Sequence, residues 1–161
     1  MTIKPGDHLP ESTFRVMTSD GPKPVTTADI FKGKKVVLFA VPGAFTPTCH
    51  KNHLPGFLAH AAEFKAKGVQ TIAVTGVNDV FVMDAWSKSS GGAGQIEFLS
   101  DGNGDFAKAL GLTMDGSAFG LGTRSLRYAM LVDDGIVKKL NVEDVPSKAD
   151  ISGAAALLKE M

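Results

Sequence analysis

The chain has 161 residues, enough for one folded domain, and it carries 17 basic and 17 acidic residues, so its net charge is zero. This balance disfavours a nucleic-acid partner, which is usually bound by a basic stripe. The apolar runs are too short to span a bilayer, and the first residues lack the apolar stretch of a signal peptide. The single cysteine excludes an internal disulfide, and we therefore expect a cytoplasmic protein with a reduced thiol.

The first part of the chain is predicted to form a β-hairpin, a helical turn and a buried strand. Residues 13–25 have the pattern of two extended segments joined by a turn-forming cluster at 19–21. Residues 27–31 are a candidate helical turn. Residues 35–41 are a continuous β-branched and apolar run, typical of a central strand covered on both faces, and Pro42 ends it because proline cannot donate to a ladder.

A long helix is predicted over residues 48–67. Its apolar residues recur with a helical period, and Gly68 supplies a stop signal. Pro55 lies inside this pattern, and since proline removes a backbone hydrogen bond, we expect a kink or break in the first turns. The apolar stripe consists of Leu54, Phe57, Leu58, Ala61 and Phe64.

The remaining elements alternate between strand and helix and then end with a hairpin. In chain order they are a strand (69–75), a helix (79–89), a strand (96–99), a short helix through Leu110, a hairpin of strands 128–132 and 136–140, and a last helix (148–159). This order favours an α/β fold, with a thioredoxin-like mixed sheet, helices on both faces and an N-terminal β-hairpin extension, as a single domain over residues 1–161. A nucleotide site is disfavoured, because no phosphate loop or dinucleotide-binding glycine pattern is present.

The segment between the buried strand and the long helix carries the candidate chemistry. Cys49 is expected in the first turn of the helix, where free backbone N–H groups and the positive end of the helix dipole stabilise a negative charge. This setting lowers the pKa of a thiol, and the thiolate is the nucleophilic form. The alternative is that Cys49 is an inert, buried small side chain.

The spacing Pro42, Thr46, Cys49 closely resembles the active-site signature of peroxiredoxins, Pro-x-x-x-Thr-x-x-Cys. The fuller string over 42–49 is similar to the type II subfamily, also called the peroxiredoxin-five group. The resemblance continues in 77–83 and in 122–130 and covers nearly the whole chain.

The resemblance implies a thiol peroxidase whose site residues are Cys49, Thr46, Arg127 and Pro42, with no cofactor and no metal. Cys49 would attack one peroxide oxygen and become a sulfenic acid. The Thr46 hydroxyl would orient the peroxide, although it could equally cap the helix, and Pro42 would shield the thiolate from water, although it could simply end the strand.

Arg127 matches the catalytic arginine of the family and would stabilise charge on the thiolate and on the leaving oxygen. Arg124 is the competing candidate, and we favour Arg127 because it directly precedes the apolar strand that begins at Tyr128. The alternative for Arg124 is a surface or interface charge. Backbone N–H groups near Thr48 and Cys49 would complete an oxyanion pocket.

The chain departs from many type II relatives because it has no second, resolving cysteine. The sulfenic acid would therefore be resolved by an external thiol. By resemblance, glutathione or glutaredoxin is the favoured donor, with thioredoxin as the alternative. Hydrogen peroxide and organic hydroperoxides are the expected substrates, and no membrane or nucleic-acid partner is expected.

Two alternative functions and the question of a homodimer stay open. Cys49 and His53 are four residues apart and could share a metal with His50 or His60, although we regard His50 and His53 as polar residues at the helix start or the pocket rim. A non-enzymatic binding module on the same scaffold is the second alternative. By resemblance, three apolar residues expected to be exposed near the dimer-forming face of the family suggest a homodimer, namely Phe45, Phe81 and Trp86, and core packing is the alternative for them.

Overall fold

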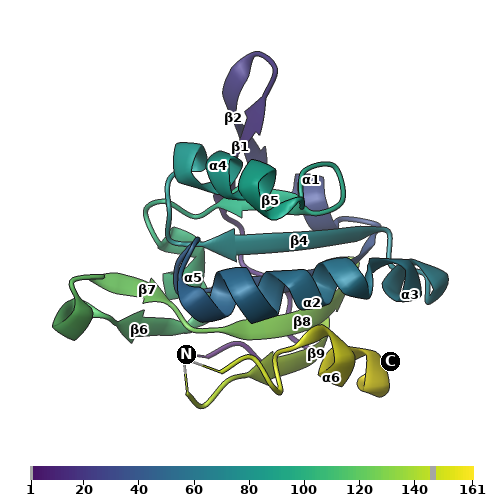
Figure 1. The fold of residues 1–161 in the computed structure, drawn as a ribbon. Helices are drawn as coiled ribbons and strands as arrows, with labels where there is room; N and C mark the ends of the chain where they lie inside the picture. The colour runs from purple at the N-terminus through teal and green to yellow at the C-terminus, as the bar shows by residue number, and fades with distance from the viewer. Residues whose placement is uncertain (1, 146–147) are drawn as a thin grey trace.

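A seven-stranded mixed sheet runs through the molecule (Figure 1). The computed structural model describes residues 2–145 and 148–161, with the side chain of each except Cys49. The strand order is β2-β1-β5-β4-β3-β8-β9. Its members are β1 (Thr13–Thr18), β2 (Gly21–Thr26), β3 (Lys35–Val41), β4 (Thr71–Gly76), β5 (Glu97–Ser100), β8 (Tyr128–Asp133) and β9 (Ile136–Val142).

Strand β3 lies inside the sheet, as its unbroken apolar run predicts. It pairs in parallel with β4 on one side and antiparallel with β8 on the other. Because side chains alternate along a strand, Val37 and Phe39 enter one core while Val36 and Leu38 enter the other. The sheet therefore separates two apolar layers, and the carboxyl end of β3 lies at the boundary between them.

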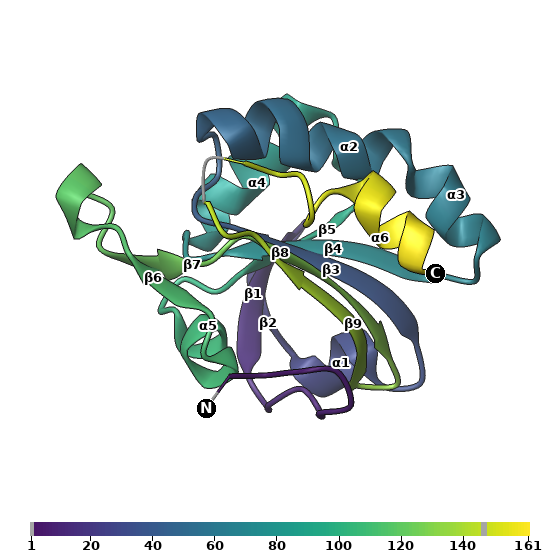
Figure 2. The ribbon, with the colours of Figure 1, turned by 90° about the horizontal axis from the view of Figure 1, so that it is seen from below.

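Helices cover both faces of the sheet (Figure 2). One face carries α2 (Leu54–Ala59), α3 (Ala61–Ala66), α4 (Val80–Ser90) and α6 (Ala154–Glu160), and the other carries α1 (Thr27–Phe31) and α5 (Asp105–Leu110). This arrangement confirms the predicted thioredoxin-like α/β class. None of the helices in the described part of the chain has the length and apolar character of a membrane-spanning segment.

Both predicted hairpins are present. The N-terminal hairpin pairs β1 with β2. In the second, β8 pairs with β9 across Asp134 and Gly135, whose φ angles of 49° and 78° are both in the left-handed region. Asp-Gly suits such a turn because glycine and, less readily, aspartate tolerate positive φ.

The predicted helix over 48–67 is divided into three parts. A widened π-helical turn, η1 (Cys49–His53), precedes α2, and α3 follows after an interruption at His60. The disturbance expected from Pro55 takes the form of η1, because one wide turn accommodates the missing N–H of proline at the start of α2. The interruption at His60 was not predicted, since neither glycine nor proline occurs there.

The last helix begins later than predicted, at Ala154 rather than at residue 148. The N–H and hydroxyl of Ser152 donate to the carboxylate of Glu143, at 2.8 and 3.0 Å. Its carbonyl also accepts a hydrogen bond from His53. These long-range bonds hold Ser152 in the loop before the helix.

A small hairpin outside the main sheet was missed by sequence reasoning. Strands β6 (Thr113–Asp115) and β7 (Thr123–Ser125) pair antiparallel, and the short helix η2 (Ser117–Phe119) lies between them. The hairpin projects from the body of the protein (Figures 1 and 2). Its strands are only three residues long, and Ser125 is their one buried residue, so they carry no periodic apolar signal.

Candidate active site

The loop after β3 brings the sequence signature into a tight turn. Pro42 and Gly43 are buried at the end of the strand. A side chain at Gly43 would approach the Arg124 Nη1 and the Thr46 Cγ2 to 3.1 Å, so glycine permits this close packing. Phe45 has a φ of 65°, which is unfavourable for a residue with a Cβ. Such strain persists only where surrounding contacts hold it, which is common at functional sites.

Thr46 joins the loop to the helix. Its hydroxyl donates to the Gly43 carbonyl at 2.8 Å, and its own carbonyl accepts from the His50 N–H at 2.9 Å. Because a hydroxyl has one proton, Thr46 acts as a hydrogen-bond acceptor toward any further group in this arrangement. Thr46 therefore fixes the loop, and it also lines the pocket described below.

The backbone of Cys49 opens η1, directly after this loop. Its side chain lies outside the described part of the structure, so the predicted nucleophile is located by its backbone alone. That position agrees with the sequence expectation of a cysteine in the first turns of a helix. The low thiol pKa argued from the helix dipole remains a prediction.

Arg127 lies just before β8 and is 2% exposed. Its Nη1 donates to the Nδ1 of His53 at 3.0 Å, and Arg127 also contributes to the lining of the pocket described below. A guanidinium keeps its positive charge in a protein, so Arg127 places a fixed cation here. The structure thus brings Arg127 together with Pro42 and Thr46 around one cavity.

His53 is 1% exposed and is the partner of this arginine, which sequence reasoning did not foresee. Of the two expected places, the helix start is the one His53 occupies, since it ends η1 and is not among the residues that line the pocket. His53 lies one helical turn after Cys49, and its ring packs edge-on against Phe39 and Phe57. The four-residue spacing from Cys49 was the available signal, and it points to the same helix side.

Burial and the nearby positive charge of Arg127 lower the pKa of His53 to about 3. The imidazole is therefore neutral at pH 7. Its Nδ1 accepts from Arg127, and its Nε2 is 2.9 Å from the Ser152 carbonyl, which can only accept. The proton consequently resides on Nε2, and this tautomer is imposed by the two partners.

Arg124, the competing arginine, contacts the same loop from outside. It is half-buried, its Nε donates to the Leu121 carbonyl at 2.9 Å, and its Nη1 donates to the Pro42 carbonyl at 3.3 Å. Arg124 is not among the residues that line the cavity beside Thr46. It therefore ties the β6–β7 hairpin to the loop, rather than serving only as the surface charge that was expected.

An open pocket of about 530 Å³ lies beside the signature loop. One side is formed by Thr46, Pro47 and Thr48. Arg127 contributes a polar group to the lining, and Pro42 contributes a rigid one. The β6–β7 hairpin supplies an apolar wall made of Met114, Phe119 and Leu121. The size is within the range of small-molecule sites, and a mostly apolar wall with a few polar groups is typical of them.

The histidines of the helix do not converge as a metal site. The described residues include no group of three or more potential ligands placed to share an ion. Both ring nitrogens of His53 are engaged, and the Nδ1 of His50 accepts from the indole N–H of Trp86 at 3.1 Å. Trp86 is completely buried, so the expectation that it is exposed is wrong.

Comparison with known proteins agrees with this geometry. The family model described as Redoxin matches residues 4–158. The chain is 49% identical over 147 residues to the chloroplastic peroxiredoxin-2E of Arabidopsis thaliana, covering 89% of this chain and 63% of that one. The crystal structure of reduced Prx3 in complex with H2O2 from Vibrio vulnificus superposes with a TM-score of 0.92 and 48% identity, covering 99% and 96% of the two chains.

A thioredoxin-like sheet with the signature loop at the end of its central strand therefore defines the class. The chain belongs to the Redoxin family and, within it, to the type II peroxiredoxins. It spans about two thirds of the length of the first two curated relatives, 63% of one and 66% of the other.

The expectation of a cytoplasmic protein is contradicted by these relatives. Besides the chloroplastic relative, the mitochondrial peroxiredoxin-2F of Arabidopsis thaliana is 45% identical over 83% of this chain and 67% of its own length. The physical reason is that a free thiol requires only a reducing compartment, which does not distinguish the cytosol from an organelle. An apolar signal peptide is likewise only one kind of targeting segment.

Proposed function

We propose that this protein is a thiol peroxidase in which Cys49 reduces the O–O bond of a peroxide. One observation carries the proposal: the only cysteine of the chain begins η1, beside a pocket that is lined by the buried cation Arg127 and by Thr46. A thiolate nucleophile, a fixed positive charge and an access route are what this reaction requires.

The reaction has two parts. The Cys49 thiolate attacks one peroxide oxygen, an S–O bond forms, and the O–O bond breaks. The sulfur is oxidised to sulfenic acid, and the peroxide is reduced to an alcohol or water once the leaving oxygen has taken a proton. A first external thiol then condenses with the sulfenic acid and releases water. A second thiol reduces the resulting mixed disulfide and restores Cys49.

Each neighbouring group has a role in the first part. The Arg127 guanidinium favours the thiolate over the thiol and stabilises charge on the leaving oxygen. Thr46 orients the peroxide through its hydroxyl oxygen, and Pro42 excludes water from one side of the pocket. The backbone N–H groups at Thr48 and Cys49 complete the electrostatic environment.

The apolar wall of the pocket favours organic hydroperoxides in addition to hydrogen peroxide. Met114, Phe119 and Leu121 offer contact to an alkyl or aryl group, which hydrogen peroxide lacks. Burial of such a group contributes to binding in proportion to the apolar area removed from water. The hairpin therefore gives organic peroxides an additional binding contribution.

The reductant is proposed to be glutathione, delivered directly or through glutaredoxin, with thioredoxin as the second candidate. The 161 residues contain one cysteine, so no second thiol of this sequence can close a disulfide within the chain. Turnover of peroxide with glutathione and glutaredoxin, compared with turnover with thioredoxin, distinguishes the two donors.

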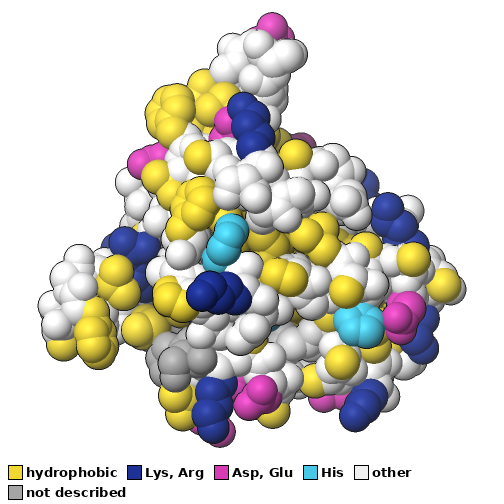
Figure 3. Space-filling view, in the orientation of Figure 1, with side chains coloured by type: hydrophobic (Ala, Val, Ile, Leu, Met, Phe, Trp, Pro, Cys, Tyr) yellow, Lys and Arg dark blue, Asp and Glu magenta, His cyan; other side chains and the backbone are white. Residues whose placement is uncertain are grey.

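A homodimer is proposed from three exposed aromatic side chains. Phe45, Phe81 and Phe119 are 46%, 65% and 82% exposed, and Figure 3 shows apolar side chains over α4 and at the tip of the β6–β7 hairpin. Exposed apolar patches of this kind often mark interfaces between proteins. Sedimentation of the wild type and of Phe81→Asp tests the proposal, with dissociation expected for the variant.

The direct test of the function follows the mass of the reduced protein after addition of one equivalent of hydrogen peroxide. We expect a sulfenic acid on Cys49 and no oxidation product in Cys49→Ser, with the fold retained. Excess peroxide is expected to drive the wild type to sulfinic acid. A wild-type protein whose Cys49 thiol remains unoxidised in excess peroxide would contradict the proposed function.

A further inference from the structure

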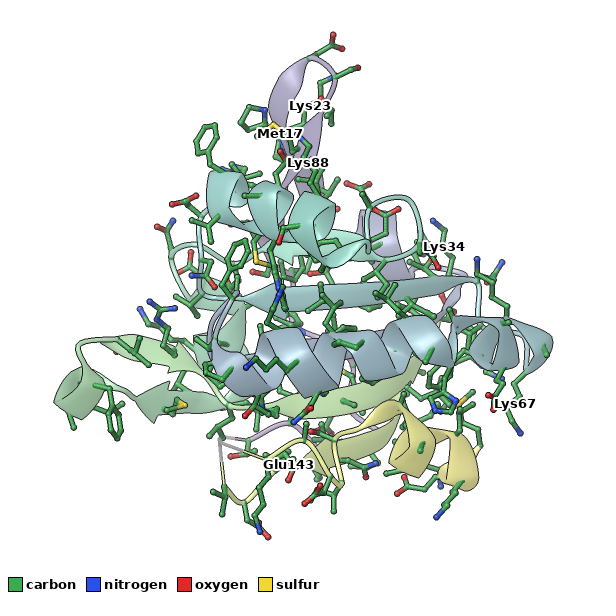
Figure 4. The ribbon with its side chains drawn as sticks, in the orientation of Figure 1. Met17, Lys23, Lys34, Lys67, Lys88 and Glu143 are labelled. Atoms are coloured by element: carbon green, nitrogen blue, oxygen red, sulfur yellow. The ribbon has the colours of Figure 1, made fainter. Side chains whose placement is uncertain are left out.

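A chain of hydrogen bonds connects the C-terminal segment to the site arginine. The carboxylate of Glu143 holds Ser152, the carbonyl of Ser152 faces His53, and His53 accepts from Arg127. All four residues are at most 7% exposed. Figure 4 labels Glu143 in the segment that follows β9, and the described part of this segment runs beside α2.

The first and last residues of this hydrogen-bond network, Glu143 and Arg127, are also joined through their backbones. The N–H of Glu143 donates to the carbonyl of Arg127 at 3.0 Å, which continues the pairing of β8 with β9 by one residue. Glu143 is thereby fixed relative to the backbone of Arg127, while its side chain fixes Ser152. The result is a closed ring of interactions that returns to the residue at which it starts.

The ring determines how the guanidinium can be oriented. A neutral histidine can accept a hydrogen bond only on its unprotonated nitrogen. The Ser152 carbonyl can only accept, so it retains the proton on Nε2 and leaves Nδ1 to receive the N–H of Arg127. If Ser152 moved away, His53 would lose one of the two partners that select this tautomer.

We propose that His53 is a positioning residue for Arg127, and that Glu143 and Ser152 maintain its tautomer and thereby the orientation of the guanidinium at Cys49. This inference rests on the proposed peroxidase function and adds a role for residues that do not line the pocket. Neither His53 nor Ser152 touches the substrate in this account. Each acts through Arg127.

Two matched pairs of variants separate hydrogen bonding from packing. His53→Leu retains an apolar side chain of similar size but removes both nitrogens. His53→Gln retains one acceptor and one donor at a similar separation. Glu143→Ala removes the acceptor for Ser152, whereas Glu143→Gln retains a carbonyl oxygen in its place. His60→Leu is the control, because His60 is partly exposed and pairs with Glu63 on the same helix.

The measurement is the second-order rate constant for oxidation of Cys49 by hydrogen peroxide as a function of pH, together with thermal unfolding. We expect His53→Leu to lower the rate constant about tenfold and to raise the apparent pKa of the thiol, since a hydrogen bond to a charged group is lost. His53→Gln is expected to retain most of the wild-type rate constant. Glu143→Ala is expected to change the rate constant and the thiol pKa in the same direction as His53→Leu, but by less. His60→Leu is expected to match the wild type.

Wild-type rates and pH profiles in folded His53→Leu or in folded Glu143→Ala would overturn the inference. Equal losses in folded His53→Leu and His53→Gln would also overturn it, because they would indicate a role in packing alone. If His53→Leu does not fold, the Glu143 pair decides the question by the same criteria. A wild-type protein that peroxide does not oxidise would instead overturn the proposed function, and the inference with it.

Discussion

At the scale of single residues, the site depends on which arginine faces the pocket. Arg127 is buried, lines the cavity and donates to His53, whereas Arg124 holds backbone carbonyls of Pro42 and Leu121. A charge buried beside the reacting atoms acts more strongly than one screened by water. The two residues are therefore expected to differ when the same substitution is made at each.

Arg127→Gln is expected to slow peroxide oxidation of Cys49 about a hundredfold, because one preorganised electrostatic donor is removed. Arg124→Gln is expected to cost far less, since its contacts are to the loop and the hairpin. Stopped-flow oxidation of both variants checks this, with circular dichroism to verify folding. A larger loss in Arg124→Gln would exchange the roles of the two arginines.

The buried His53 predicts an acid-sensitive fold. Its pKa is about 3 in the folded protein, below the ordinary value of 6.5. Between these values the unfolded chain binds more protons than the folded one, so stability is complete above about pH 6.5 and is lost as the pH falls toward 3. The maximal slope is about 1.4 kcal/mol per pH unit.

Urea unfolding of the wild type and His53→Gln at a series of pH values tests this expectation. Burial raises the pKa of Asp101, which acts in the opposite direction, but the difference between the two proteins cancels that contribution. We expect the wild type to lose stability relative to the variant on acidification. A difference that is constant between pH 7.5 and pH 4 would show that His53 does not titrate in this way.

At the scale of elements, the β6–β7 hairpin is expected to set peroxide preference. Phe119 is 82% exposed although it lines the pocket, so its replacement should leave folding unchanged. Phe119→Ser is expected to lower the rate constant for cumene hydroperoxide relative to that for hydrogen peroxide by about tenfold. The reason is that the aryl group of the peroxide loses roughly half of its contact with an aromatic side chain. Phe81→Ser, on α4 and outside the pocket lining, is the matched control. An unchanged ratio in Phe119→Ser would remove the hairpin from substrate selection.

Local patterns predicted most of the elements because each depended on residues close in sequence. The apolar run of β3 and the Asp-Gly turn after β8 are examples, and both are present. The position of Cys49 at a helix start followed from the same local reasoning. The start of α6 was wrong because Ser152 is held by Glu143, a contact formed only by the folded chain.

The same reason explains what sequence reasoning missed in the site. His53 and Arg127 are far apart in the chain, and no periodicity predicts that their side chains meet. The apolar wall of the pocket comes from a hairpin whose strands are too short to produce a pattern. The family motif contains Pro42 and Thr46, and both line this pocket, while their catalytic roles stay predictions.

At the scale of the whole molecule, the two apolar cores share one sheet. Alternate residues of β3 belong to opposite cores, so neither layer can separate without exposing the other face of the same strands. We therefore predict one cooperative domain, with coincident urea transitions by far-UV circular dichroism and by fluorescence of Trp86, the only tryptophan. Two separated transitions would contradict the single-domain prediction.

Peroxide reduction at this site requires Cys49 to be a thiolate at neutral pH. Its ionisation can be measured directly from thiolate absorbance at 240 nm in the reduced wild type, with Cys49→Ser as the blank. We predict an apparent pKa well below the ordinary thiol value of about 8.5, because a helix start and a buried guanidinium both stabilise the anion. A titration midpoint at or above that ordinary value would contradict the account.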